Sequence, residues 1–381
     1  MCPSGGGRSR PKWGVGGFAR RSRKRTLVLQ SYRLTCTGSA ILNSSPVHQN
    51  RVYVAKWRTQ LNVAAEKRSA QTRGMHAWPQ IPDDVVTWFR GVFAEANRHV
   101  CERLVNLPNI RETSLDDGLI EALIPDTAPT LLPSGAIVRM DTHNIGGLRR
   151  IGRPDWDLPY RGRWETADIA ILVFIYRGET LVAKKIGLLQ SKRLYPDNND
   201  VDDDDEIGFL HGMNAFIRRE ASQSIAALHR NFAFNQSCIY GAMRAGTHQI
   251  QSIERINRDF GKTVYYLLYN PHIVPLSVSY PLQQRIRIDR PTVGCRVFDA
   301  DYVHKILSGL NEGGAPTFGM MESAGITSAW PLETWAADLL LTCQVGQAFE
   351  NSRDAEVRYF LERRSGPIGA ALAASITLPD N

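Results

Sequence analysis

The feature that most constrains the fold is a pair of apolar segments joined by a short turn, within residues 164–194. Residues 167–176 (ADIAILVFIY) are apolar or β-branched at both odd and even positions, which is typical of a strand buried on two faces. Residues 177–180 (RGET) supply turn residues, and residues 181–194 (LVAKKIGLLQSKRL) have the pattern of a returning strand. The sequence therefore predicts an antiparallel hairpin.

The segments around this hairpin predict a layered α/β fold. Apolar residues at helical spacing predict helices over residues 83–107, 114–123, 211–230, 245–260, 332–349 and 353–364. Strand patterns cover residues 135–140, 262–269 and 375–378. From the second helix onward the order is helix, strand, strand, strand, helix, strand. We therefore expect a mixed sheet flanked by helices, followed by a helical C-terminal extension.

Polar residues interrupt the apolar hairpin at its open end. A turn centred at residues 178–179 places Asp168 opposite Leu189, next to Gln190. Gln190 and Lys192 are two positions apart, so they project from the same face of their strand. Asp168 shares that face only if a β-bulge or a shifted turn changes the register by one residue.

These polar residue types suit phosphodiester hydrolysis. Burying a charged group without a partner costs several kcal/mol, so such groups form pairs or bind metals. Asp168 and the amide oxygen of Gln190 are hard oxygen ligands of the kind that Mg²⁺ prefers. Lys192 beside them could orient or deprotonate a water and stabilise charge on a phosphate. The competing interpretation is a structural Asp168–Lys192 ion pair, with Gln190 satisfying a backbone group.

The spacing of these residues resembles a known active-site pattern. Residues 165–168 (ETAD), the hairpin and residues 188–192 (LLQSK) resemble the D…Q-x-K pattern of Mrr-like nucleases in the PD-(D/E)-x-K superfamily. The resemblance covers approximately residues 112–271. It implies a restriction-endonuclease-like αβββαβ core and metal-dependent endonuclease activity, on DNA in preference to RNA.

The resemblance also assigns roles to individual residues. It implies that Asp168 is the principal metal ligand, Gln190 a second ligand and Lys192 the catalytic lysine. Glu112, on the helix before the first core strand, matches the position of a supporting carboxylate. The main-chain carbonyl of Ser191 would face the metal, which is expected to be Mg²⁺, with Mn²⁺ as the alternative ion.

One departure from the superfamily pattern affects the expected ligand set. Most members carry an acid where this chain has Gln190, and a neutral amide donates less charge to a metal. Glu112 or Glu165 therefore becomes more important, and Asp116 and Asp117 on the same helix compete for that role. Glu112 also has a simpler interpretation, as an acid favoured by the dipole at a helix N-terminus.

A loop rich in arginine leads into the Asp168 strand. Residues 146–164 (GGLRRIGRPDWDLPYRGRW) interleave arginines with aromatic residues, which suits phosphate contacts and base stacking. The candidate nucleic-acid contacts are Arg149, Arg150, Arg153, Arg161 and Arg163. The alternative is a loop held to the domain by its aromatic residues, with solvated arginines.

The charge distribution divides the chain at about residue 74. Residues 1–74 contain fifteen Lys or Arg residues and one acid, Glu66, so the remainder of the chain carries a net charge of −6 although the whole chain carries +8. The basic segment is expected to be disordered. It could be a basic arm, a solvated tail or an untranslated stretch preceding Met75. Residues 75–381 are expected to form the nuclease-like domain, with its core at about 108–271 and its extension at 272–381.

Other sequence features limit the remaining function classes. The longest apolar run, Ile169–Tyr176, is much shorter than the roughly 20 residues that cross a bilayer, so no membrane partner is expected. Six scattered cysteines argue against a zinc site and for reduced thiols in a cytoplasm. The expected partner is nucleic acid, with a homodimer or a defence-system subunit as further candidates. Bacterial restriction or anti-phage defence is one expected setting.

Two alternatives to a DNA endonuclease remain open from the sequence. One is a catalytically inactive member of the same fold that binds nucleic acid or acts as a scaffold. Gln190 and the net negative charge of the globular part favour that interpretation. The other is an RNA-directed, toxin-like nuclease that shares the same site.

Overall fold

A computed structural model describes residues 78–145, 167–197, 230–280, 282–324, 329–361 and 368–380, all within one compact unit, Trp57–Asn381. The strands are β1 (Thr130–Leu131), β2 (Ile137–Asn144), β3 (Ala167–Arg177), β4 (Thr180–Arg193), β5 (Arg230–Phe234), β6 (Val264–Tyr269), β7 (Leu276–Tyr280), β8 (Arg296–Asp299), β9 (Ala329–Pro331), β10 (Gln347–Ala348) and β11 (Ile368–Leu378). The helices are α2 (Asp83–Asn106), α3 (Glu112–Ala122), α5 (His248–Asp259), α6 (Ala300–Ser308), α7 (Phe318–Ala324), α8 (Leu332–Thr334) and α9 (Asp354–Phe360).

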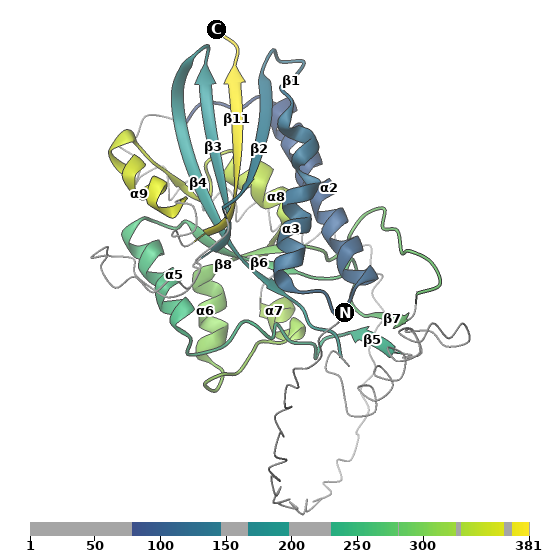
Figure 1. Ribbon diagram of the computed structural model, residues 1–381. Coiled ribbons are helices and arrows are strands. Elements are labelled where there is room, and N and C mark those ends of the chain that lie inside the picture. The colour runs from purple at the N-terminus through teal and green to yellow at the C-terminus, as the bar shows by residue number, and fades with distance from the viewer. Residues whose placement is uncertain are drawn as a thin grey trace, which may run out of the picture. The chain divides into compact units, whose positions relative to one another are not determined.

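The centre of the fold is a mixed sheet of nine strands (Figure 1). Its strand order is β1-β2-β11-β3-β4-β6-β8-β9, and β10 adds to β4. β11 runs parallel to β3 and β4 runs parallel to β6, whereas β3 and β4 are antiparallel. β5 and β7 form a separate two-stranded ribbon. The predicted α/β class with a mixed, helix-flanked sheet is therefore confirmed.

The predicted hairpin is present, with a β-bulge that changes its register. Next to the turn, Arg177 pairs with Thr180 and Tyr176 with Leu181, as expected for a turn at residues 178–179. Beyond the bulge, Ile175 pairs with Ala183, so Val182 is the extra residue of β4. Ile169 is then opposite Leu189, so the prediction that Asp168 lies opposite Leu189 is wrong by one residue.

The bulge has a direct consequence for the site. If the observed register continued for one more residue, Asp168 would lie opposite Gln190. The two side chains would then share one face of the hairpin, as the predicted site requires. The last described β3–β4 pair is Ile169 with Leu189, so Asp168 lies where the ladder between the two strands ends.

β11 is inserted in the middle of the sheet, which the sequence pattern did not predict. Only its C-terminal part, residues 375–378, was expected as a strand, and the region after residue 271 was expected to be a helical extension. That expectation is wrong, because β8, β9, β10 and β11 all pair within the main sheet. β11 separates β2 from β3, and Ile368 is opposite Ala167 in the parallel ladder with β3.

Helices cover both faces of the sheet. Tyr265 of β6 packs edge-on against Trp335, whereas its neighbour Tyr266 contacts His304 of α6. Adjacent strand residues point to opposite faces, so α6 and the Trp335 segment lie on opposite sides of the sheet. α2 joins the Trp335 side through an ion pair between Arg90 and Asp338.

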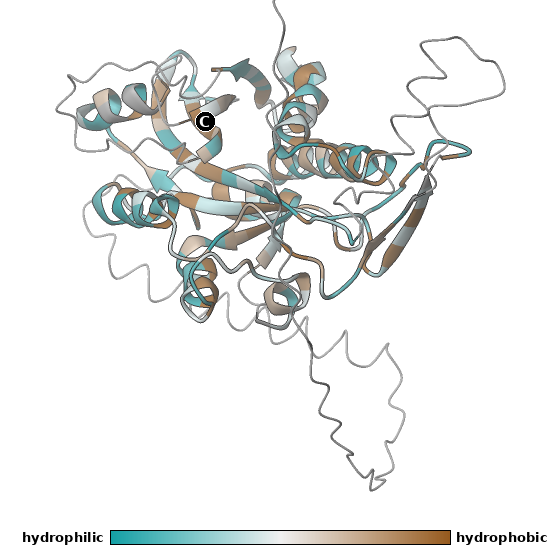
Figure 2. Cartoon of the chain, turned by 60° about the horizontal axis from the view of Figure 1, so that its bottom comes forward, coloured by the Kyte–Doolittle hydropathy of each residue, from teal (hydrophilic) through white to brown (hydrophobic). Residues whose placement is uncertain are grey.

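The helices are amphipathic where they meet the sheet. α2 buries Val85, Phe89, Phe93, Val100 and Leu104, which recur every three or four positions except between Phe93 and Val100, where Ala96 fills the interval. α5 is mostly hydrophilic, as its colouring in Figure 2 shows, and its buried residues are Ile253 and Ile256. Within the described residues, no helix has the length and apolar character needed to span a membrane.

Two predicted helices differ from the structure. The helix expected over residues 332–349 is divided into α8 and a π-helical segment, Trp335–Leu340. It ends where Cys343 adopts a φ of 66° and Gly346 a φ of 74°, and β10 follows. The helix expected over residues 211–230 lies outside the described residues except for Arg230, which begins β5.

Candidate active site at the open end of the hairpin

The sheet brings the predicted site residues to one edge. β4 and β6 are parallel, with Lys192 opposite Leu268 and Arg193 opposite Tyr269, so their C-terminal ends lie side by side. The N-terminal end of the antiparallel strand β3 lies at the same edge. α3 contacts β4 there, with Glu112 in its first turn.

The carboxylate of Asp168 binds β4 where the backbone ladder has ended. Its Oδ2 atom accepts hydrogen bonds from the main-chain N–H of Ser191 at 2.6 Å and from the Ser191 hydroxyl at 2.9 Å. The same oxygen accepts a bond from the Gln190 amide. Charge-assisted bonds of this kind are stronger than neutral ones, so Asp168 fixes the end of the hairpin as well as exposing a carboxylate.

Lys192 is almost fully buried and bonds to α3. Its Nζ atom lies 3.1 Å from Oε1 of Glu112 and donates to the main-chain carbonyl of Ser191 at 2.6 Å. The second oxygen of Glu112 accepts the main-chain N–H of Arg193 at 2.9 Å. The carbonyl of Ser191, which the resemblance directed toward a metal, is therefore bonded to Lys192.

A second carboxyl group of α3 also belongs to the site. Asp116 is four positions after Glu112, which places both on one face of α3, and it is buried. The hydroxyl of Tyr269, the last residue of β6, donates to Asp116 at 2.6 Å. The sequence marked Asp116 only as a competitor of Glu112 and did not mark Tyr269. The four-residue spacing of Glu112 and Asp116 was the sequence signal that could have identified Asp116 as a site residue.

Arg193 holds the turn between α2 and α3 against β4. Its guanidinium is buried, donates to the carbonyl of Pro108 at 2.6 Å and lies 4.3 Å from the ring centre of Tyr195. Burial lowers the pKa of this guanidinium, although Tyr195 and Glu112 oppose the effect. Because Pro108 precedes Glu112 by four residues, this bond helps to place the Glu112 carboxylate. Sequence reasoning did not identify Arg193.

The electrostatics of the cluster reflect an excess of carboxyl groups. Burial and the nearby Asp168 carboxylate raise the pKa of Asp116 well above its ordinary value. Burial also raises the pKa of Glu112, against the opposing charge of Lys192. Burial alone would lower the pKa of Lys192, but the charges of Glu112 and Asp168 outweigh it, so that pKa is raised. The ammonium form of Lys192 is therefore favoured.

The donor set fits an oxygen-ligated divalent cation. Among the described residues, no three His, Cys, Asp or Glu side chains are grouped so that they could hold a metal by themselves. The amide oxygen of Gln190 adds a ligand of another kind, since it is buried and bonds to none of the described groups. A divalent ion between Asp168 and Gln190 would satisfy that oxygen and neutralise the surplus carboxylates. Glu112 or Asp116 would complete the set.

Several predicted residues lie outside the described part of the chain. They are Arg149, Arg150, Arg153, Arg161, Arg163 and Glu165. Asp168 is half-buried and the Glu112 side chain is 19% exposed, so the described cluster reaches solvent. An apolar pocket lies elsewhere, between α9 and the turn half of the hairpin, and is lined by Phe174, Leu181 and Phe349 among others.

Comparison of the chain with protein-family models, with curated proteins and with solved structures gave no match.

Proposed function

We propose that the chain is a metal-dependent endonuclease of the PD-(D/E)-x-K type, acting on DNA, with its active site at the open end of the β3–β4 hairpin. The observation that carries this proposal is the meeting of Asp168, Gln190, Lys192 and Glu112 at one sheet edge. When β1 and the ribbon strand β5 are left out, the order α3, β2, β3, β4, α5, β6 supports an αβββαβ core, with β11 inserted between β2 and β3.

The proposed ligands are Asp168 and Gln190, supported by Glu112 or Asp116. When bound, Mg²⁺ or Mn²⁺ would supply a Lewis acid for a phosphate oxygen and for the attacking water. Asp168 is held by Ser191 and Gln190, so its carboxylate is positioned before any ligand arrives. Such preorganisation reduces the cost of assembling a site.

Lys192 supplies a fixed positive charge in this scheme. Its contact with Glu112 and its bond to the Ser191 carbonyl hold Nζ in place and stabilise the ammonium form. A protonated lysine can bind a phosphate oxygen, stabilise the charge that develops there and orient a water. These roles fit the surroundings of Lys192 better than proton abstraction does.

The test is cleavage of supercoiled plasmid by the full-length protein with Mg²⁺, with Mn²⁺ and with a chelator. We expect metal-dependent nicking or linearisation that Asp168→Ala and Lys192→Ala each reduce by at least about 10²-fold. Lys184→Ala is the matched control, because Lys184 is also a poorly exposed lysine of β4 paired with an acid, Asp354. Cleavage that survives both site variants would refute the proposal.

A second candidate function is a non-catalytic subunit of the same fold. The observation that favours it is internal pairing, because both oxygens of Glu112 are bonded within the cluster and Oδ2 of Asp168 accepts three donors. A purely structural cluster of this kind needs no metal. It would give a protein that binds nucleic acid equally well with and without divalent ions and never cleaves it.

A further inference from the structure

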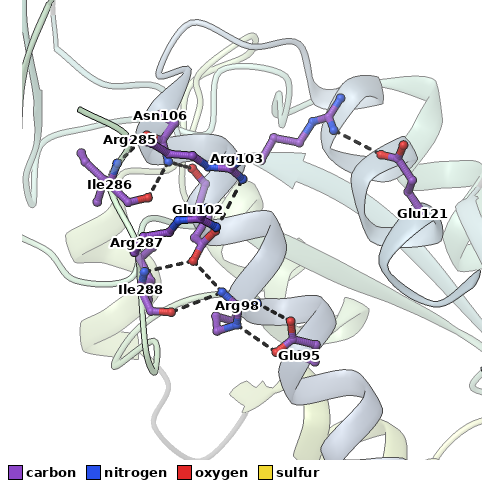
Figure 3. Close-up of polar contacts among 10 residues, drawn as sticks. All are labelled: Glu95, Arg98, Glu102, Arg103, Asn106, Glu121, Arg285, Ile286, Arg287 and Ile288. Atoms are coloured by element: carbon purple, nitrogen blue, oxygen red, sulfur yellow. Dashed lines mark hydrogen bonds and ion pairs between the residues drawn. The ribbon is translucent and has the colours of Figure 1, made fainter. Parts of the chain in front are cut away.

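A second polar cluster lies on the C-terminal half of α2, where residues 285–288 cross the helix (Figure 3). Arg98, Glu102 and Asn106 of α2 are four positions apart and form one stripe. Ile286 N–H donates to Oδ1 of Asn106 at 2.8 Å, and the Asn106 amide donates to the Ile286 carbonyl at 2.8 Å. The Asn106 side chain therefore pairs with both the N–H and the carbonyl of Ile286, as the backbone of a neighbouring strand would.

The same stripe holds the next part of the segment. Ile288 N–H donates to Oε1 of Glu102 at 3.0 Å, and Arg98 reaches the Ile288 carbonyl at 3.5 Å. Ile288 is buried against Cys101 and Val105, with Ile286 packed beside them. Buried apolar contacts and hydrogen bonds to the backbone of Ile286 and Ile288 therefore attach the segment to α2.

The attachment projects two arginines into solvent. Residues alternate in an extended segment, so Arg285 and Arg287 point away from the isoleucines and are 57% and 71% exposed. Both guanidinium groups lie over Oε2 of Glu102, at 3.6 Å and 3.8 Å. Glu102 is only 2% exposed, so its carboxylate holds the two arginines from beneath.

The charges of this cluster do not cancel. Arg98 is paired with Glu95 and also lies 2.5 Å from Glu102. The Glu102 carboxylate therefore pairs with three guanidinium groups. In total, the carboxylates of Glu95 and Glu102 are matched by three arginines. The surplus positive charge lies at the outer ends of Arg285 and Arg287, whose several N–H donors can bind phosphate oxygens in a fork.

The cluster lies close to the candidate active site. Glu112 is six positions after Asn106, so at 3.8 Å per step their Cα atoms are at most about 23 Å apart. Cys101 of α2 contacts the carbonyl of Asn270, the residue after Tyr269, which bonds to Asp116. In Figure 1 the green segment after β7 passes beside α2. One turn of duplex DNA, about 34 Å long, could therefore contact both places.

We infer that Arg285 and Arg287 bind the phosphate backbone of the nucleic acid whose cleavage is proposed above, on a surface that adjoins the active site. This inference rests on the proposed function for the identity of the partner. It assigns the two arginines to positioning through phosphates, which is independent of base sequence. Glu102, Asn106 and Arg98 fix the segment that carries them.

The test is equilibrium binding of a fluorescein-labelled DNA duplex to the full-length protein, measured by fluorescence anisotropy. A chelator is present so that no cleavage occurs. We expect Arg285→Gln/Arg287→Gln to weaken binding about tenfold at moderate salt. We also expect the slope of log affinity against log salt to become shallower by about two, roughly one for each lost phosphate contact. The matched control is Arg255→Gln/Arg258→Gln on α5, where the arginines are 45% and 72% exposed.

The outcomes separate this inference from the proposed function. Binding that is lost in the Arg285/Arg287 variant but kept in the α5 variant supports the inference, even if no cleavage is found with Mg²⁺. Metal-dependent cleavage with unchanged affinity and salt slope in the Arg285/Arg287 variant overturns the inference alone. Equal weakening in both double variants also overturns it, because the effect would then reflect net charge. An Arg285→Lys/Arg287→Lys variant that keeps the salt slope would confirm the electrostatic origin.

Discussion

The two ends of the β3–β4 hairpin carry similar residues in different electrostatic settings. At the turn end, Lys184 of β4 pairs with Asp354 of α9, whose side chain is 44% exposed. At the open end, Lys192 of the same strand pairs with Glu112 of α3, whose side chain is 19% exposed. Both lysines are poorly exposed, and both acids come from a helix packed near the strand.

The difference is the number of carboxyl groups around each lysine. The surroundings of Lys192 include Asp168 and Asp116 as well as Glu112, and their charges contribute to its raised pKa. The open end also has a buried amide oxygen, Oε1 of Gln190, that bonds to none of the described groups. The ion pair of Lys184 is therefore a structural feature, whereas a lysine among surplus carboxyl groups and an unsatisfied oxygen is a candidate site for a cation and a phosphate.

The largest expected difference between the two ends is in catalysis. Lys192→Ala should reduce plasmid cleavage by about 10²-fold to 10³-fold, the range for removing one group that stabilises charge developing in the transition state. Lys184→Ala should leave the cleavage rate per folded molecule within a factor of about two, at a stability cost of about 1 kcal/mol or less. Initial rates measured on both variants check this. Equal losses of cleavage would remove the distinction between the two ends.

The second difference concerns stabilisation by metal ions. Mg²⁺ should raise the melting temperature of the protein, because an ion that binds only the folded state adds about 2.7 kcal/mol at a hundred times its dissociation constant. Asp168→Asn should abolish this increase, and Lys184→Ala should retain it. Thermal unfolding at increasing Mg²⁺ concentrations provides the measurement. An increase that persists in Asp168→Asn would place the ion elsewhere.

The third difference is the pH dependence of stability without metal. The raised pKa of Asp116 means that the folded state binds this proton more tightly than the unfolded chain does. The resulting stabilisation is fully present below the ordinary carboxyl value of 3.8 and is lost as the pH rises through the folded-state pKa. We therefore expect the melting temperature to fall by a few degrees as the pH rises through that window, and Asp116→Asn to flatten the slope. A slope that Asp116→Asn leaves unaltered would contradict this assignment.

The smallest expected effect is at the turn itself. Gly178 has a φ of 52°, which an alanine adopts at a cost of about 1 kcal/mol. Gly178→Ala should therefore lower the free energy of unfolding slightly, measured by urea denaturation, while the cleavage rate per folded molecule stays the same. A loss of cleavage in a folded Gly178→Ala protein would show that the turn end takes part in the chemistry.

The sequence pattern predicted those elements whose residues and partners are close together in the sequence. The helical spacing of α2, the apolar run of β3 and the all-apolar β6 each identify an element, because every one of them buries a continuous face. The hairpin was predicted for the same reason, with turn residues between two apolar runs.

Long-range pairing and register could not be predicted in the same way. β11 pairs with β3 although Ile368 and Ala167 are far apart in the sequence, and no local pattern records a partner. No local pattern marks the bulge at Val182, so the sequence placed Asp168 one position out of register. The roles of Tyr269 and Arg193 arise only when β6, β4 and the α2–α3 turn meet.

The most direct test of the metal site is diffraction from crystals grown with Mn²⁺, with the anomalous signal of the ion measured. We expect an anomalous peak at the open end of the hairpin, in contact with the Asp168 carboxylate and Oε1 of Gln190. Well-ordered density for Asp168, Gln190 and Lys192 at saturating Mn²⁺, with no peak between them, would contradict it.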